Sequence, residues 1–311
     1  MTNNPGFRSL KVYGYAMLAM LFWGLSFVWF KIVVREYGPI TIIFLRLVFS
    51  GSLLLLYLWI TRNFQKIARQ DIKWFLLLSF TQPFCYFLGE SFGLQLVSST
   101  VSSVVISTIP LFSPVAAYIA YRERISSEIF TGIIFSFIGI IFMLINPDLS
   151  FNAAPRGIAL LFVAVFSAVS YSVIIRKLAF GYHPATIISM QNLVGAVYFL
   201  PLFLWFDCRQ FISIRPSADV LWALLQLAVF ASTLSYVFYI ISIREIGVVK
   251  SNVLTNLIPV FTAVASFYIL AEKFTLAKII GMAFVMAGVI IAQYRSIRQN
   301  LRRKIQQEPQ D

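Results

Sequence analysis

The sequence is poor in charged residues and has almost no histidine or cysteine. Only 12% of the 311 residues are charged, and 12 residues are acidic, whereas ordinary soluble domains are about 25% charged. A soluble protein of this length needs far more charge on its surface. The composition therefore excludes the two soluble domains that the length alone would suggest.

The chain has few residues that could support histidine or cysteine chemistry. The chain has one histidine and two cysteines, and Cys85 and Cys208 do not have the spacing of metal ligands. It contains no phosphate-binding loop, HExxH zinc motif or dinucleotide fingerprint. We therefore expect no catalytic residues, no metal and no cofactor. The chain is also too apolar to contain a nucleotide-binding domain, which excludes transport driven by its own ATP hydrolysis.

Long hydrophobic runs are abundant. Hydrophobic residues make up 59% of the chain, and a membrane-spanning helix needs about 20 in succession. None of the runs has the polar alternation of an outer-membrane barrel strand. We predict an all-α integral membrane protein with ten transmembrane helices, at residues 12–34, 40–60, 74–96, 99–121, 128–146, 157–176, 184–205, 219–243, 249–270 and 274–294.

Lysine and arginine are unequally distributed among the predicted loops. With a cytoplasmic N-terminus, 17 of the 25 basic residues lie on the cytoplasmic side, seven lie outside and Arg46 lies within a span. Cytoplasmic loops of membrane proteins are enriched in these residues. The distribution predicts that both termini are cytoplasmic. It also explains the net charge of +13 by membrane orientation, without nucleic-acid binding.

Two parts of the chain resemble each other at a constant offset. Residues 109–141 align without a gap with residues 258–290, 149 positions later. A weaker similarity at offset 145 relates residues near 31–39 to residues near 176–184. The identical pairs at offset 149 include Pro110/Pro259, Phe112/Phe261, Ala116/Ala265, Glu123/Glu272, Gly132/Gly281, Phe135/Phe284 and Gly139/Gly288.

A true repeat would give each half of the chain five spans. An odd number of spans inverts the second half relative to the first, which is the plan of many secondary transporters, with the substrate site between the halves near the membrane midplane. We predict a first repeat at residues 1–148, a second at 149–294 and a basic, disordered cytoplasmic tail at 295–311. The alternative is that two apolar hairpins have converged on similar sequences.

Several short motifs occur in the same order as in a known family. They are FWGLSFVWFK at residues 22–31, the spacing from Pro39 to Arg46, and an Ile-Pro-x-Phe segment followed by glutamate in both halves. Together they resemble the drug/metabolite transporter superfamily, and within it the EamA family. The second half departs from this pattern, because Gln191 stands at the position that corresponds to Arg46.

The resemblance implies a transporter for small metabolites, and members of this superfamily handle amino acids, sugars and nucleotides. We expect secondary active or facilitative transport by alternating access, with export across a bacterial inner membrane. The expected partners are a small-molecule substrate and the lipid bilayer, with proton coupling, as a monomer or homodimer. The alternatives are a flippase for lipid-linked sugars, a receptor without transport activity and a membrane enzyme.

Two opposite charges lie inside predicted spans at similar depth. Arg46 is about six residues into the second span, and Glu90 is about six residues before the third span ends. A charge within a span costs at least about 2.5 kcal/mol, so it is normally paired or faces water. We expect Arg46 and Glu90 to approach each other, with Lys31 nearby. They would bind a substrate carboxylate or amine, or exchange a proton at Glu90, or form a fixed ion pair.

Other polar residues in the spans are candidates for a central cavity, and interhelical hydrogen bonds are the alternative. Trp23 lies in the body of the first span, away from the membrane surfaces that tryptophan prefers. Ser103 and Ser107 correspond to Asn252 and Asn256 at offset 149. The predicted substrate-binding or cavity-lining residues are Trp23, Lys31, Arg46, Gln82, Tyr86, Glu90, Ser103, Ser107, Tyr236, Asn252 and Asn256.

One pair of prolines and one pair of glutamates occupy equivalent positions in the repeat. Pro110 and Pro259 fall within predicted spans, where proline removes a backbone hydrogen bond, so they are candidate hinges or static kinks. Glu123 and Glu272 lie in equivalent tight connections. They would cap the start of the following helix, because carboxylates favour helix N-termini, or they would form gating ion pairs.

Overall fold

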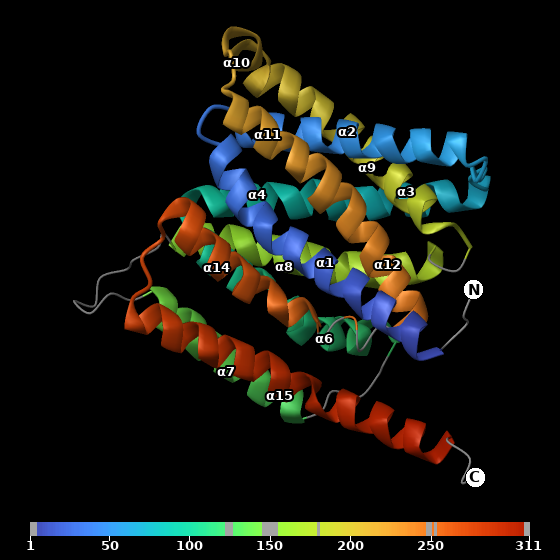
Figure 1. The fold of residues 1–311 in the computed structure, drawn as a ribbon, viewed down its shortest axis with the longest axis vertical. Helices are drawn as coiled ribbons and strands as arrows, with labels where there is room; N and C mark the ends of the chain where they lie inside the picture. The colour runs from blue at the N-terminus through green and yellow to red at the C-terminus, as the bar shows by residue number, and fades with distance from the viewer. Residues whose placement is uncertain are drawn as a thin grey trace.

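The structure, a computed structural model, describes residues 5–121, 127–144, 155–178, 181–246, 251 and 254–307. These residues form helices, turns and loops, without a strand among them. Figure 1 shows the helices packed side by side, with α7 and α15 together along one edge. The elements of the first half are α1 (Pro5–Val33), α2 (Pro39–Ile60), η1 (Arg69–Asp71), α3 (Ile72–Ser79), η2 (Phe80–Cys85), α4 (Tyr86–Leu96), α5 (Ser99–Ile106), α6 (Ile109–Tyr121) and α7 (Ser127–Leu144).

The second half repeats this succession of helices. Its elements are α8 (Pro155–Leu178), α9 (Pro184–Leu202), η3 (Phe203–Asp207), α10 (Cys208–Ser213), α11 (Ala218–Gln226), η4 (Leu227–Leu234), α12 (Ser235–Ile246), η5 (Thr255–Leu257), α14 (Ile258–Leu270) and α15 (Leu276–Gln307). Each predicted span coincides with one helix or with consecutive helical segments, as far as its residues are described. The helix α15 continues to Gln307, so it includes residues 295–307 of the predicted basic tail.

Five helical stretches among the described residues are long and apolar enough to cross a membrane. They are Lys11–Val33, Pro39–Ile60, Pro155–Ile175, Pro184–Ser213 and Ala218–Ile246. Shorter apolar helices are found at Ser99–Ser113, Ser127–Met143, Thr255–Leu270 and Leu276–Ala292. Large apolar side chains, among them Trp59, Trp205 and Trp222, are exposed on the outside of the bundle. Such a surface suits a lipid environment, so the described part of the chain has the helices and the exterior of a membrane protein.

Two helices are interrupted at equivalent places by wide turns. The π-helical segment η2 lies between α3 and α4, and η4 lies between α11 and α12. Adding the repeat offset of 149 to residues 80–85 gives 229–234, which fall within η4. Wide turns of this kind occur often at functional sites, because they leave backbone groups without the usual helical partner. Both interruptions contribute residues to the buried polar cluster around Arg46 and Glu90, which is called the polar centre below.

The last helix of each half packs against the other through glycines. A Cβ atom on Gly139 would lie 2.5 Å from the carbonyl oxygen of Gly281, and one on Gly132 would meet that of Gly288 even more closely. At offset 149 Gly132 corresponds to Gly281 and Gly139 to Gly288. The contact of Gly132 with Gly288 is therefore the repeat equivalent of the contact of Gly139 with Gly281. The helices α7 and α15 are therefore antiparallel, and a local two-fold axis relates their contacts.

The second helices of the two halves show the same relation. Asn192 on α9 donates a 2.8 Å hydrogen bond to Ser50 on α2, and the Leu47 side chain lies 3.4 Å from a Cβ built on Gly195. At offset 145 Ser50 corresponds to Gly195 and Leu47 to Asn192. These two contacts are therefore also repeat equivalents of each other. Helices far apart in sequence thus form the centre of the bundle in pairs.

Candidate functional site

Arg46 lies at the centre of this bundle. Its side chain is 5% exposed, on the α2 face that packs against η4 and α9. The Nε atom donates a 2.9 Å hydrogen bond to the hydroxyl of Ser232 in η4. The guanidinium carbon lies 4.3 Å from the centre of the Phe87 ring, a cation–π contact. The charge is therefore held by one hydroxyl and one aromatic face, one from each half of the chain.

Glu90 is close to this charge without being bonded to it. The hydroxyl of Tyr86 donates a 2.8 Å hydrogen bond to Oε1 of Glu90, one helical turn away on α4. The guanidinium of Arg46 interacts electrostatically with Glu90, Tyr86 and Tyr236. In the described part of the chain, Arg46 donates its Nε–H to Ser232 and makes no ion pair with Glu90.

Aromatic residues surround these two charges. Gln82, which has extended backbone angles inside η2, donates a 2.7 Å hydrogen bond to the Tyr236 hydroxyl. The Trp23 ring packs edge-on against Tyr236 and Tyr239, with ring centres 5.2 and 5.1 Å apart. Its indole N–H donates to the carbonyl of Ala231 in η4 at 3.2 Å. The two wide turns and α1 thus meet at one place.

A chain of hydroxyl and amide groups continues from Ser232. The Ser50 hydroxyl donates to the Ser232 carbonyl at 2.9 Å, and Asn192 and Thr233 both hydrogen-bond to that Ser50 hydroxyl. On the α9 side, the Tyr171 hydroxyl donates to Gln191, the residue that corresponds to Arg46. Both halves therefore supply polar groups, whereas the charges of the centre, Arg46 and Glu90, come from the first half.

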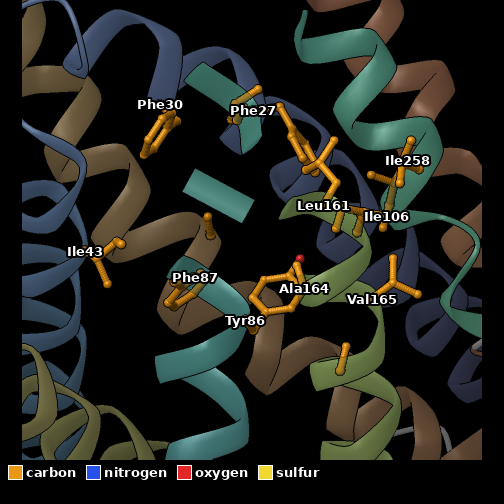
Figure 2. Close-up of a cluster of buried hydrophobic side chains, with 14 of the residues drawn as sticks. Phe27, Phe30, Ile43, Tyr86, Phe87, Ile106, Leu161, Ala164, Val165 and Ile258 are labelled. Carbon is orange, nitrogen blue, oxygen red and sulfur yellow. The ribbon is translucent and has the colours of Figure 1, made fainter. Parts of the chain in front are cut away.

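The polar centre rests on a buried hydrophobic core. Figure 2 shows Tyr86 and Phe87 pointing to opposite sides of α4, Phe87 toward Ile43 and Tyr86 toward Ala164 on α8. A Cβ atom on Gly89 would meet the backbone of α8 at Ala164, 2.8 Å from its nitrogen, so glycine allows α4 and α8 to approach closely. This close packing brings α4, which carries Tyr86 and Glu90, against α8.

Trp23, Arg46, Gln82, Tyr86, Glu90 and Tyr236 are brought together, but the remaining predicted site residues lie elsewhere or make other contacts. Lys31 is not near Arg46 and Glu90 as expected: it lines a separate groove with Arg35 and Glu272. The hydroxyls of Ser103 and Ser107 are buried and donate to carbonyls three residues earlier in their own helix. Hydroxyls in apolar surroundings bond back in this way, which leaves them without a contact to another helix.

Asn256 and the two prolines lie at helical junctions. Asn256, in η5, is 5% exposed, and neither its side-chain nitrogen nor its oxygen has a hydrogen-bond partner. Asn252 and Glu123 lie outside the described residues. Pro110 and Pro259 are the second residues of α6 and α14, where a missing N–H costs little. They begin new helical segments instead of kinking continuous ones.

Glu272 does cap a helix, but not the helix that follows it. Its Oε1 atom accepts a 2.8 Å hydrogen bond from the backbone N–H of Ser99, and Oε2 accepts a 2.8 Å bond from the Thr100 hydroxyl. The carboxylate thus stabilises the start of α5, in the other half of the chain. This partner depends on how the halves dock, so the position of Glu272 in the sequence could not reveal it.

A second polar cluster joins the start of α3 to the ends of α8 and α12. The Tyr182 hydroxyl donates a 2.7 Å hydrogen bond to Asp71, which raises the pKa of Tyr182. Nδ1 of His183 accepts from the N–H of Ala185 at the start of α9. Partial burial and the nearby Arg244 charge lower the pKa of His183. These contacts hold the 61–71 segment of the first half against the second half.

Several residues of the polar centre were not predicted, namely Ser50, Phe87, Tyr171, Gln191, Asn192, Ser232, Thr233 and Tyr239. A small hydroxyl or amide in an apolar helix is as consistent with helix packing as with a site, so the sequence carries no signal that separates Ser232 from Ser103. The described residues contain no cluster of three metal-ligating side chains. The centre can bind charged and aromatic groups through hydrogen bonds, cation–π contacts and ring packing.

Comparison with known proteins agrees with a two-part chain whose halves meet at this centre. The sequence model of the EamA-like transporter family matches residues 10–145 and again residues 155–294. The chain belongs to the EamA-like transporter family. The predicted family is confirmed, and the two matches show that the chain contains the family repeat twice.

Other EamA-like proteins are similar over most of their length. An uncharacterized transporter of Archaeoglobus fulgidus is 28% identical over 274 residues, which cover 88% of this chain and 95% of the relative. The uncharacterized transporter YetK of Bacillus subtilis is 25% identical over 79% of this chain and 75% of the relative. A crystal structure of an unspecified protein has the same fold, with a TM-score of 0.65, 15% identity and coverage of 91% and 98%. Family and relatives are named as transporters.

Proposed function

We propose that this EamA-like protein is a secondary transporter with ten membrane-spanning helices in two inverted repeats, at residues 1–148 and 149–294. Both termini are cytoplasmic, and the protein exports small metabolites across a bacterial inner membrane by alternating access. The crosswise contacts of α7 with α15 and of α2 with α9 support this plan. Two similar halves of opposite orientation can exchange conformations, which would open one shared site first to one side and then to the other.

The observation that carries the proposal is that Arg46 and Glu90, in the described structure, each bond to a neutral group and not to each other. A charge inside a membrane helix is costly and normally has a partner or a function. Arg46 is buried and donates to a neutral hydroxyl, while the Glu90 carboxylate accepts from a neutral tyrosine. Each charge therefore retains the capacity to bind an oppositely charged group. A metabolite with a carboxylate and an ammonium group, such as an amino acid or a related compound, satisfies both.

Glu90 also supports proton coupling. It is the carboxylate of the polar centre, and the Tyr86 hydroxyl can bond to it in its ionised form. Binding of a proton would neutralise it and release the ammonium group of the substrate. A proton and a substrate would then compete for one carboxylate, which is a simple physical basis for exchange.

Transport assays with purified protein in liposomes test the proposal. We expect counterflow of at least one amino acid or related metabolite in a screen, with a rate that depends on an imposed pH gradient. Replacement of Glu90 by glutamine is expected to abolish the pH dependence, because the amide cannot ionise. Binding without counterflow would indicate a receptor, a chemically new product would indicate an enzyme, and movement of lipid-linked sugars alone would indicate a flippase.

Cysteine labelling tests the orientation separately. In a variant whose two native cysteines are replaced by serine, we would introduce Asn63→Cys or Ser213→Cys, both at exposed positions. A membrane-impermeant maleimide applied to intact cells is expected to label Ser213→Cys and to spare Asn63→Cys until the cells are permeabilised. The physical reason is that an odd number of spans, five, separates the two positions. Equal labelling of both in intact cells would contradict the predicted topology.

A further inference from the structure

A groove outside the polar centre contains two cations that lack a direct partner. It has a volume of about 420 Å³ and lies between the end of α1, the junction of α4 with α5, and the loop after α14. Its polar side chains are Lys31, Arg35, Gln95, Ser98 and Glu272. Both α1 and α14 end on the left side in Figure 1, opposite the side on which α1 begins. The volume is within the range of small-molecule sites.

The carboxylate in this groove is already fully engaged. Glu272 accepts 2.8 Å hydrogen bonds from the Ser99 N–H and the Thr100 hydroxyl, and the Thr100 N–H lies 3.5 Å from Oε2. Lys31 interacts with Glu272 electrostatically. Within the described chain, however, neither Lys31 nor Arg35 donates a side-chain hydrogen bond or forms an ion pair, so both side chains are available to an anion in the groove.

Apolar side chains line the rest of the groove. Leu96, Val97 and Leu270 lie next to the polar set. A ligand that suits this lining has one anionic head and a small apolar body. Glu272 itself demonstrates that the site can hold a carboxylate, because a protein carboxylate occupies the donors at the start of α5.

We propose that this groove binds small organic anions, and that the anion competes with Glu272 for the donors of Ser99 and Thr100 and for the charge of Lys31. The site is distinct from the polar centre, since Lys31 makes no contact with Arg46 or Glu90. Displacement of Glu272 would free the start of α5 from the loop after α14. Because Glu272 belongs to the second half and α5 to the first, anion binding would loosen a contact between the two halves.

Binding of 4-fluorobenzoate to the purified full-length protein tests this proposal. Saturable broadening of its fluorine NMR signal measures the affinity, with 4-fluorobenzylamine as a probe of the same size and opposite charge. We expect the benzoate to bind and the amine not to. Lys31→Gln should weaken benzoate binding about tenfold, the effect of losing one charge-assisted contact. Glu272→Gln should strengthen it several-fold, because the competing carboxylate is gone.

Lys273→Gln is the matched control, since Lys273 adjoins Glu272 in sequence but does not line the groove. It should leave the affinity unchanged, and all variants are checked for folding by size-exclusion chromatography. Equal binding of benzoate to wild type and Lys31→Gln, or equal binding of the amine, would overturn the proposal. Dihexanoyl phosphatidylglycerol as a second anion separates the sources: if it displaces benzoate at lower concentration, the natural anion is a lipid headgroup.

The same protein preparations distinguish this inference from the proposed function. Benzoate binding does not require transport, and counterflow does not require benzoate. Counterflow with no benzoate binding would refute the groove site and leave the transporter intact. Benzoate binding with no counterflow of any metabolite would refute the transporter and leave the groove site intact.

Discussion

Replacing Arg46 with methionine is expected to reduce substrate counterflow by about 100-fold. A charge-assisted hydrogen bond contributes about 1.5–3 kcal/mol, and Arg46 is the cation that the polar centre offers to a substrate carboxylate. Methionine has a similar length and stays apolar, so it fills the space against Phe87 without the charge. The measurement is the initial rate of counterflow for whichever metabolite the liposome screen identifies.

Loss of the Arg46 charge also affects folding, and a second variant separates the two effects. Arg46→Met leaves Glu90 as a charge without its electrostatic partner, which destabilises a buried site. The double variant Arg46→Met with Glu90→Gln removes both charges, so it should regain wild-type thermal stability while transport stays lost. Arg69→Met, at an exposed position in η1, is the control and should transport normally. Normal transport by Arg46→Met would show that Arg46 has only a structural role.

Gly139→Val is expected to destabilise the protein by about 3 kcal/mol. Overpacking of a well-packed interface costs about 1–3 kcal/mol, and this position lies at the upper end because the nearest atoms are backbone. A Cβ there would lie 2.5 Å from the Gly281 carbonyl oxygen and 2.8 Å from the Val285 nitrogen. Neither group can move without separating α7 from α15. Thermal unfolding followed by size-exclusion chromatography in detergent measures the effect.

Gly14→Val provides the matched control for that substitution. Gly14 is also a helical glycine, in α1, but a Cβ atom there would have no neighbour within 4 Å. We expect it to unfold at nearly the wild-type temperature. If Gly14→Val and Gly139→Val unfold at the same temperature, the close approach of α7 and α15 is not important for stability. The crosswise pairing of the repeats would then lose its main physical support.

The candidate site was partly predictable from individual residues. A charge within an apolar run is conspicuous, and for this reason Arg46 and Glu90 could be identified and placed at similar depth. Lys31 was predicted to lie near these two charges. It lies in the last turn of α1, however, and the rotation of that helix turns it toward Glu272. Helix rotation depends on packing that hydropathy does not encode.

The wide turns η2 and η4 were not predicted from the sequence. The first contains Pro83, but the second, at residues 227–234, contains neither proline nor glycine. It persists because Trp23 and Ser50 donate to its carbonyls at Ala231 and Ser232. Those donors come from α1 and α2, so the turn is stabilised by tertiary contacts.

The amino-acid sequence by itself determined that this protein is helical and membrane-embedded, that it is built from a repeated unit and that it belongs to the EamA-like family. The first two properties follow from the length of apolar runs and from residue identities at a constant offset, and the family follows from the order of its short motifs. All of these are features of segments. Only the tertiary structure decided that Arg46 bonds to Ser232, that Glu272 caps α5 and that Gly139 meets Gly281. Each of these contacts joins two segments far apart in the chain, and its partner is selected by how closely two helices approach and how each is rotated.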